Sequence, residues 1–139
     1  MDPAEPAAEA RIRAAGRELV DSRPISRDVG AYREFIHASR GEFTVATDVY
    51  MRPRSEWFSD RSVCYLAAAK PVVTQDTAFG KFVPTGEGLF AYATMEEAVD
   101  ALAPMPIIPA TPRPRGGSRP SIFGAERVLG RLLADAGLA

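Results

Sequence analysis

The sequence contains very few of the residues that make disulfides, metal sites and catalytic dyads. Its 139 residues include one cysteine, Cys64, and one histidine, His37. A single cysteine cannot form an internal disulfide, and a single histidine cannot complete a metal cluster or a histidine dyad, so we expect neither a metal nor a bound cofactor. Unpaired cysteine behaves as a small hydrophobe, and we therefore expect Cys64 to pack inside a protein from a reducing compartment.

Long apolar runs, an excess of one charge and phosphate-loop motifs are missing as well. No apolar stretch approaches the ~18 residues of a membrane-spanning helix, and the first residues, MDPAEPAAEA, carry acids and prolines where a signal peptide would be basic. The net charge of -1 gives no general attraction to nucleic acid. The absence of a Walker loop and of GxGxxG argues against a P-loop ATPase or a standard dinucleotide enzyme. We expect a cytoplasmic protein without a nucleic-acid partner or a membrane span.

The sequence does contain short apolar strands that alternate with helical patterns. The expected strands are residues 43–46, 72–75 and 88–92, and the pattern leaves open a fourth at residues 19–20. Three helices have a start signal, with Ser26, Ser59 and Thr94 at the N-cap, and Thr94 and Glu97 have capping-box spacing. The first of these helices is expected to stop at Gly41, and a last helix is expected over residues 125–136.

Composition divides the chain into four parts, of which one holds the expected strands. Residues 1–18 form a leader with a weak helical pattern, 19–103 a domain that holds the expected strands, 104–121 a linker rich in proline, arginine and glycine, and 122–139 a C-terminal helix. Buried strands that alternate with helices indicate an α/β fold with a small parallel sheet of three to four strands and flanking helices. A complete Rossmann domain has about six strands.

Two loops of this domain carry candidate binding residues. In open parallel sheets, ligands bind at the carboxyl ends of the strands, where loops meet helix N-termini. Ser59, Asp60, Arg61 and Ser62 open a helix whose free N–H groups and dipole suit a diphosphate, although Ser59 and Asp60 could simply cap that helix. Asp76 and Thr77 follow the middle strand and could meet sugar or ribose hydroxyls, or form only a turn.

One continuous run resembles a known family. The residues WFSDRSVCYLAAAKPVVTQDT, 57–77, with GEFTVA before them and PTGEGLFAY after them, resemble the C-terminal domain of bacterial glycosyltransferases of the GT-B type, which have two Rossmann-like domains. The likeness extends from about Leu19 to Leu102, and GAERVLGRLLADAGL is similar to the closing helix of those proteins.

This resemblance implies that residues 19–103 are a Rossmann-like nucleotide-sugar-binding domain, with a nucleotide diphosphate sugar as the ligand. Residues 59–62 would then lie beside the diphosphate, and Asp76 and Thr77 near the sugar or ribose. The acceptor site belongs to the N-terminal domain of such enzymes, so the chain would be a fragment, half of a Rossmann-like GT-B C-terminal domain, inactive alone and completed by a chain that supplies the N-terminal half. The expected catalytic residues stay unassigned.

The chain departs from the family at three positions. The family usually has glycine where Ala69 and Glu56 stand, and lysine where Thr47 stands. If Ala69 adopts a left-handed conformation, the missing glycine costs about 1 kcal/mol. The small sheet also allows a second interpretation, a non-catalytic α/β interaction module that docks onto a partner chain through an open edge.

Overall fold

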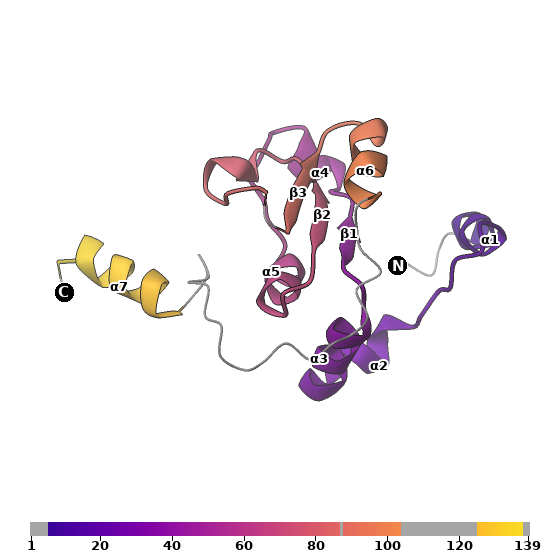
Figure 1. Cartoon of the computed structure of the whole chain (residues 1–139), viewed down its shortest axis with the longest axis horizontal. Coiled ribbons are helices and arrows are strands. Elements are labelled where there is room, and N and C mark those ends of the chain that lie inside the picture. Colours follow the sequence, from indigo (N-terminus) through magenta and orange to yellow (C-terminus); the bar gives the residue numbers. More distant parts are fainter. Residues whose placement is uncertain (1–5, 87, 104–124, 138–139) are drawn as a thin grey trace. The chain divides into compact units, whose positions relative to one another are not determined.

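The structure is a computed structural model that describes residues 6–86, 88–103 and 125–137 (Figure 1). The chain divides into two compact units, Met1–Phe35 and Ile36–Ala139. The linker predicted for residues 104–121 lies outside the described residues. In the part of the chain that is described, no helix is long and apolar enough to cross a membrane.

The N-terminal region consists of short helices, and two of them begin at aspartate residues. α1 spans Pro6–Ala14, α2 spans Ser22–Arg27 and α3 spans Val29–Ala38. Asp21 accepts a hydrogen bond from the Arg23 amide at the start of α2, and Asp28 accepts one from the Ala31 amide at the start of α3. Short carboxylates before a helix satisfy backbone donors that the helix itself cannot satisfy.

Three sequence predictions in this region are wrong. Ser26 lies inside α2 and caps no helix, because the carboxylate of Asp28 starts α3 instead. Residues 19–20 form no strand, since they join two helices and pair with no neighbour. α3 ends at Ala38, and Gly41 does not have the positive φ of a left-handed helix stop.

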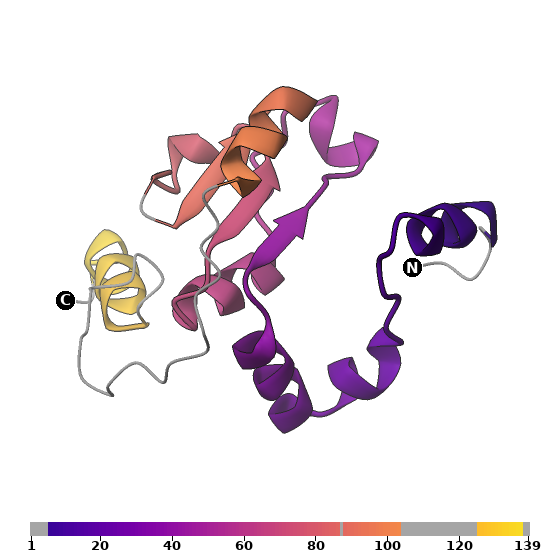
Figure 2. The ribbon, with the colours of Figure 1, turned by 45° about the vertical axis from the view of Figure 1, so that its right-hand side comes forward.

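A parallel sheet forms the centre of the second unit. β1 spans Glu42–Thr44, β2 spans Val72–Gln75 and β3 spans Leu89–Tyr92. Within the described residues the sheet has three strands in the order β1-β2-β3, which lie side by side in Figures 1 and 2. The register aligns Phe43 with Val73 and Val73 with Phe90. The expected α/β class with a small parallel sheet and flanking helices is confirmed, and β2 has the predicted bounds.

Two helices cover opposite faces of the sheet. Val73 and Tyr92 point to one face and form a buried cluster with Ala98 of α6, which spans Met95–Leu102. Glu42 and Thr44 point to the other face, because side chains alternate along a strand, and both bond to Arg61 of α5, which spans Asp60–Ala67. The carboxyl ends of the strands therefore lie between two helix layers.

β1 differs from the fully buried strand that the sequence predicts. Its buried side chains are the polar Glu42 and Thr44, whereas Phe43 is 47% exposed, and Val45, just beyond the strand, is 62% exposed. β1 is an edge strand that pairs only with β2 in the described part of the sheet, and α6 packs against β2 and β3. The apolar face of β1 consequently stays partly exposed within the described residues.

The buried face of α5 also differs from the prediction. Ser62 and Tyr65, three residues apart, are buried, whereas the side chain of Cys64 is exposed. Successive helical residues are rotated by about 100°, so a helix that turns positions 62 and 65 inward turns position 64 away from the sheet. The predicted packing role of Cys64 is wrong.

The remaining elements complete the second unit. α4, Asp48–Met51, is a short helix inside a stretch that the sequence predicts as a loop. η1, Phe79–Lys81, is a single 3₁₀ turn after β2. The capping box of Thr94 and Glu97 at the start of α6 is confirmed. α7 spans Ala125–Asp135, one residue short of the prediction, and Gly137 follows it with the left-handed φ of 69°.

Candidate functional site

The candidate site lies at the carboxyl edge of the sheet, where two loops leave neighbouring strands. The first loop, residues 45–59, follows β1, contains α4 and leads into α5. The second loop, residues 76–86, follows β2 and contains η1. The carboxyl ends of parallel strands meet at one edge, so both loops emerge there. The candidates that the sequence marks lie where the first loop enters α5, at residues 59–62, and at the start of the second loop, at Asp76 and Thr77.

Backbone contacts join the two loops directly. The Glu56 amide donates to the carbonyl oxygen of Thr77 at 2.9 Å, and the Thr77 hydroxyl donates to the carbonyl oxygen of Trp57 at 2.6 Å. The rings of Phe58 and Phe79 pack with centroids 5.0 Å apart. The loops therefore form one connected surface, although about twenty residues separate them in sequence.

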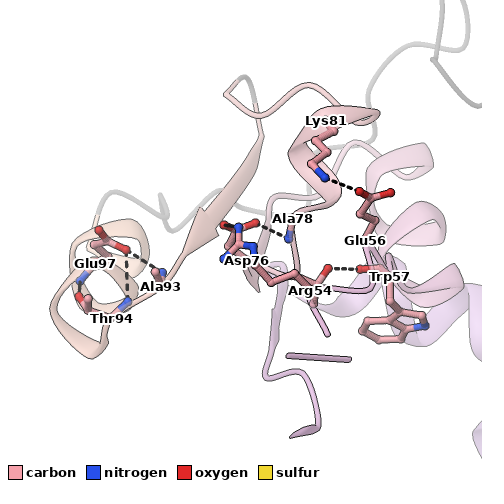
Figure 3. A network of polar contacts seen from close by, with 10 residues as sticks. Arg54, Glu56, Trp57, Asp76, Ala78, Lys81, Ala93, Thr94 and Glu97 are labelled. Carbon is pink, nitrogen blue, oxygen red and sulfur yellow. Dashed lines mark hydrogen bonds and ion pairs between the residues drawn. The ribbon is translucent and has the colours of Figure 1, made fainter. Parts of the chain in front are cut away.

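Two ion pairs connect the same loops at the surface. Arg54 Nη2 lies 3.2 Å from Asp76 Oδ2, and Lys81 Nζ lies 2.5 Å from Glu56 Oε1. The Arg54 and Lys81 side chains are each 63% exposed, and the two carboxylate side chains are each 32% exposed. Figure 3 shows both pairs spanning the gap between the loops. Asp76 and Glu56 are thus each paired with a cation that remains accessible to solvent.

The start of α5 lacks the cap that the sequence predicts. Ser59 has the extended N-cap conformation, with φ -76° and ψ 135°, but its side chain makes no capping hydrogen bond. The Ser62 hydroxyl is fully buried and has no hydrogen-bond partner among the described residues. The backbone N–H groups of the first turn are therefore not satisfied by Ser59, and they provide the partial positive charge of a helix N-terminus.

The structure places the four predicted diphosphate-binding residues in different surroundings. Asp60 is exposed, whereas Ser59 is nearly buried and Ser62 wholly so. Arg61 turns away from the loops, with Nε 2.6 Å from Glu42 Oε1 and Nη2 2.7 Å from Thr44 Oγ1. The Arg61 side chain thus joins α5 to β1, and the Ser62 side chain is buried. The backbone N–H groups of this helix start are therefore the groups that could contact a ligand.

The two predicted sugar or ribose residues are both engaged within the protein. Thr77 is 1% exposed and uses its hydroxyl to hold Trp57. Asp76 accepts from the Ala78 amide at 2.8 Å through Oδ1 and from Arg54 through Oδ2. The structure therefore brings Asp76 to the rim of the site and places Thr77 beneath it.

The sequence did not predict a role for Arg54 or Lys81, or the ion pair between Glu56 and Lys81. The available signal was weak: Arg54 and Lys81 are cations in two loops that follow adjacent strands. Because the pairs Arg54–Asp76 and Glu56–Lys81 join positions 22 and 25 residues apart, only the folded chain reveals them.

Left-handed backbone marks four positions near these elements that are not glycine. They are Arg54, Glu56, Ala69 and Ala78, with φ values of 48°, 62°, 56° and 77°. Such a conformation costs a residue with a Cβ about 1–2 kcal/mol. Glu56 and Ala69 are the two positions where the resembled family usually has glycine.

Aromatic residues support the edge of the sheet. Tyr50 and Trp57 of the first loop stack with ring centroids 4.5 Å apart and an interplanar angle of 6°. The Tyr92 hydroxyl donates to the carbonyl oxygen of Thr44 at 3.0 Å, which links the ends of β3 and β1. Burial raises the pKa of Tyr92 above its usual value of 10.0, because the phenolate loses hydration there.

Neither metal-binding geometry nor known relatives add to this site. Among the described residues, no group of three or more histidine, cysteine, aspartate or glutamate side chains could hold a metal ion. The chain matches no protein-family model, no curated protein and no solved structure. A functional hypothesis has to be based on the sequence pattern and on the geometry of the two loops.

Proposed function

We propose that this chain is the donor-nucleotide half of a GT-B type glycosyltransferase, with a nucleotide diphosphate sugar bound at the carboxyl edge of the sheet. The observation that carries the proposal is that hydrogen bonds join the two loops at this edge. The loops that the sequence resemblance assigns to the diphosphate and the sugar are joined by the Glu56–Thr77 and Thr77–Trp57 hydrogen bonds, beside the start of α5. We also propose that the three-stranded sheet of the described residues is half of a Rossmann-like domain.

The backbone conformation supports this assignment independently of side-chain identity. Glu56 and Ala69 both have positive φ, and the resembled family usually has glycine at both places. Glycine is favoured where the chain must adopt a left-handed conformation. If the loops of this chain follow the same backbone course as those of the family, we expect positive φ at these two positions even without glycine.

The chemistry of glycosyl transfer fits the groups at this edge. The bond between the anomeric carbon and the diphosphate breaks, and negative charge develops on the leaving diphosphate. The N–H groups at the start of α5 and the cations of the loops can stabilise that charge. Transfer also needs an acceptor held in attack geometry, which we assign to an N-terminal domain on a partner chain, so the isolated chain should bind the donor without transferring its sugar.

A ligand screen tests the proposal. Titration calorimetry with UDP, GDP and dTDP, each free and as a sugar conjugate, should give saturable binding for one nucleotide, and the ligand should raise the unfolding temperature. At a concentration of about 100 times Kd the stabilisation is about 2.7 kcal/mol. Amide NMR shifts upon binding should concentrate in residues 56–62 and 76–81. No binding at about 10 mM, far above the range of specific nucleotide sites, would refute the proposal.

The exposed face of β1 favours a second candidate function, the interaction module. Phe43 and Val45 are exposed side by side on an edge strand. An edge with apolar side chains is a template for pairing with another chain. Sedimentation velocity at several concentrations, with Val45→Lys as the comparison, tests this function. A wild-type chain that stays monomeric alone and in mixtures with candidate N-terminal domains would speak against it.

A further inference from the structure

Two solvent-accessible cations lie in the two loops of the proposed site, and each is paired with a carboxylate of the opposite loop. Arg54 belongs to the first loop and pairs with Asp76 of the second, whereas Lys81 belongs to the second loop and pairs with Glu56 of the first. The arrangement is reciprocal, since each loop contributes one cation and one carboxylate (Figure 3). Ion pairs this exposed contribute little to stability, so both cations can contact a ligand at little cost to the fold.

Each cation retains donors for a further partner. A guanidinium carries five N–H donors, and Arg54 forms one hydrogen bond to Asp76 among the described residues. An ammonium carries three, and Lys81 forms one to Glu56 within the described part of the chain. Both side chains can therefore bind an anion without releasing the carboxylates that hold them.

The carboxylates have less capacity to contact a ligand. Both oxygens of Asp76 accept hydrogen bonds, one from the Ala78 amide and one from Arg54. A diphosphate carries negative charge, so it would be repelled by Asp76 and Glu56 and attracted by the cations in front of them. In each ion pair, the cation is therefore the group that would contact the ligand, and the carboxylate is the group that holds the cation.

We propose that Arg54 and Lys81 contact the diphosphate of the ligand, and that Asp76 and Glu56 are positioning residues that hold these two cations. This inference rests on the proposed function and refines it, because it moves the diphosphate contacts from the side chains of Arg61 and Ser62 to Arg54 and Lys81. It also changes the role of Asp76 from a sugar or ribose contact to the support of Arg54.

Binding measurements on single variants test the two cations. Affinities of the full chain for inorganic pyrophosphate, and for UDP, GDP and dTDP, are measured by calorimetry for wild type, Arg54→Ala and Lys81→Ala. Each variant should bind diphosphate about tenfold more weakly, the loss expected for one charge-assisted contact. The matched control is Arg52→Ala, because Arg52 forms an exposed pair with Asp48 in the same loop and should change the affinity less than twofold.

The positioning role of Asp76 has its own readout. Asp76→Asn should weaken the free nucleotide and its sugar conjugate by the same factor, because the lost contact is to the diphosphate. A direct contact with the sugar would weaken the conjugate alone. In the Arg54→Ala background, Asp76→Asn should cause no further loss, since the residue that it positions is gone.

The outcomes separate this inference from the proposed function. If wild type binds no diphosphate ligand, both fail. If wild type binds but Arg54→Ala and Lys81→Ala bind equally well, the donor site stands and the cation assignment is wrong. If Asp76→Asn weakens only the sugar conjugate, Asp76 is a sugar contact and the positioning role is overturned. Circular dichroism and melting of each variant confirm that the compared proteins are folded.

Discussion

Ala69 shows how one residue can store strain at the end of a helix. The Lys70 amide donates to the Tyr65 carbonyl oxygen at 2.9 Å, and the Ala69 amide donates to that of Leu66 at 2.9 Å. These two bonds form a Schellman motif, whose left-handed position is Ala69 with φ 56°. Ala69 thus has the left-handed conformation for which the sequence predicts a cost of about 1 kcal/mol. Pro71 follows the motif, so the Schellman motif and not the proline ends the helix.

Replacing this alanine should therefore stabilise the protein. Ala69→Gly removes the clash of Cβ with the backbone and should raise the free energy of unfolding by about 1 kcal/mol, after the larger entropy of glycine in the unfolded chain is included. Urea denaturation measures the change. Ala67→Gly is the matched control, since Ala67 is exposed and helical and should lose about 0.5–1 kcal/mol. Equal losses in both variants would contradict the assigned strain.

At the scale of the element, α5 and α6 begin in contrasting ways. The Thr94 hydroxyl accepts from the Glu97 amide at 3.2 Å, and the Glu97 carboxylate accepts from the Thr94 amide at 3.2 Å, so α6 satisfies its own donors. The Ser59 side chain forms no such bond at the start of α5. A helix that leaves its first turn uncapped at the edge of a site retains N–H groups for an anion, and this contrast agrees with the proposed diphosphate position.

The contrast predicts different costs of removing the two hydroxyl groups. Without ligand, Thr94→Ala should lower the free energy of unfolding by about 1 kcal/mol, the usual cost of losing an N-cap bond. Ser59→Ala should lower it by less than about 0.5 kcal/mol, because no capping bond is lost. Paired thermal or urea unfolding curves test both. A Ser59→Ala loss as large as that of Thr94→Ala would show that Ser59 caps α5 in solution.

At the scale of the whole molecule, Tyr92 ties the sheet together. Its ring stacks on Phe43 of β1 at a centroid distance of 5.5 Å, and its hydroxyl donates to the carbonyl oxygen of Thr44. Both contacts cross β2 and bind the outer strands to each other. Burial raises the pKa of this phenol in the folded protein, so the unfolded chain releases the proton first as pH rises.

Stability should consequently fall at high pH through Tyr92. The stabilising contribution of the raised pKa is complete below the unfolded value of 10.0 and is lost as pH rises through the folded value. Tyr92→Phe should be less stable than wild type by about 1 kcal/mol at neutral pH, for the lost hydrogen bond. The difference should shrink as pH rises above about 10, where wild type loses its advantage. A difference that is constant with pH would contradict the assignment.

Packing against the sheet explains where sequence predictions of burial went wrong. The helical pattern around α5 predicts a helix but not its rotation, and only packing against the sheet turns Ser62 inward and Cys64 outward. Likewise, residues 43–46 are apolar enough for a buried strand, but β1 lies at an edge, where Phe43 and Val45 stay exposed. Burial depends on what lies opposite a residue, which a local pattern does not contain.

The sequence by itself determines several local elements of this protein and the positions of the loops that hold candidate binding residues. β2 and the capping box of α6 follow from neighbouring residues, because strand propensity and capping act over a few positions. Only the tertiary structure decides which side chains meet at the site. Arg54 with Asp76, and Glu56 with Lys81, come together because parallel strands bring both loops to one edge and left-handed turns at Arg54 and Glu56 shape the first loop there.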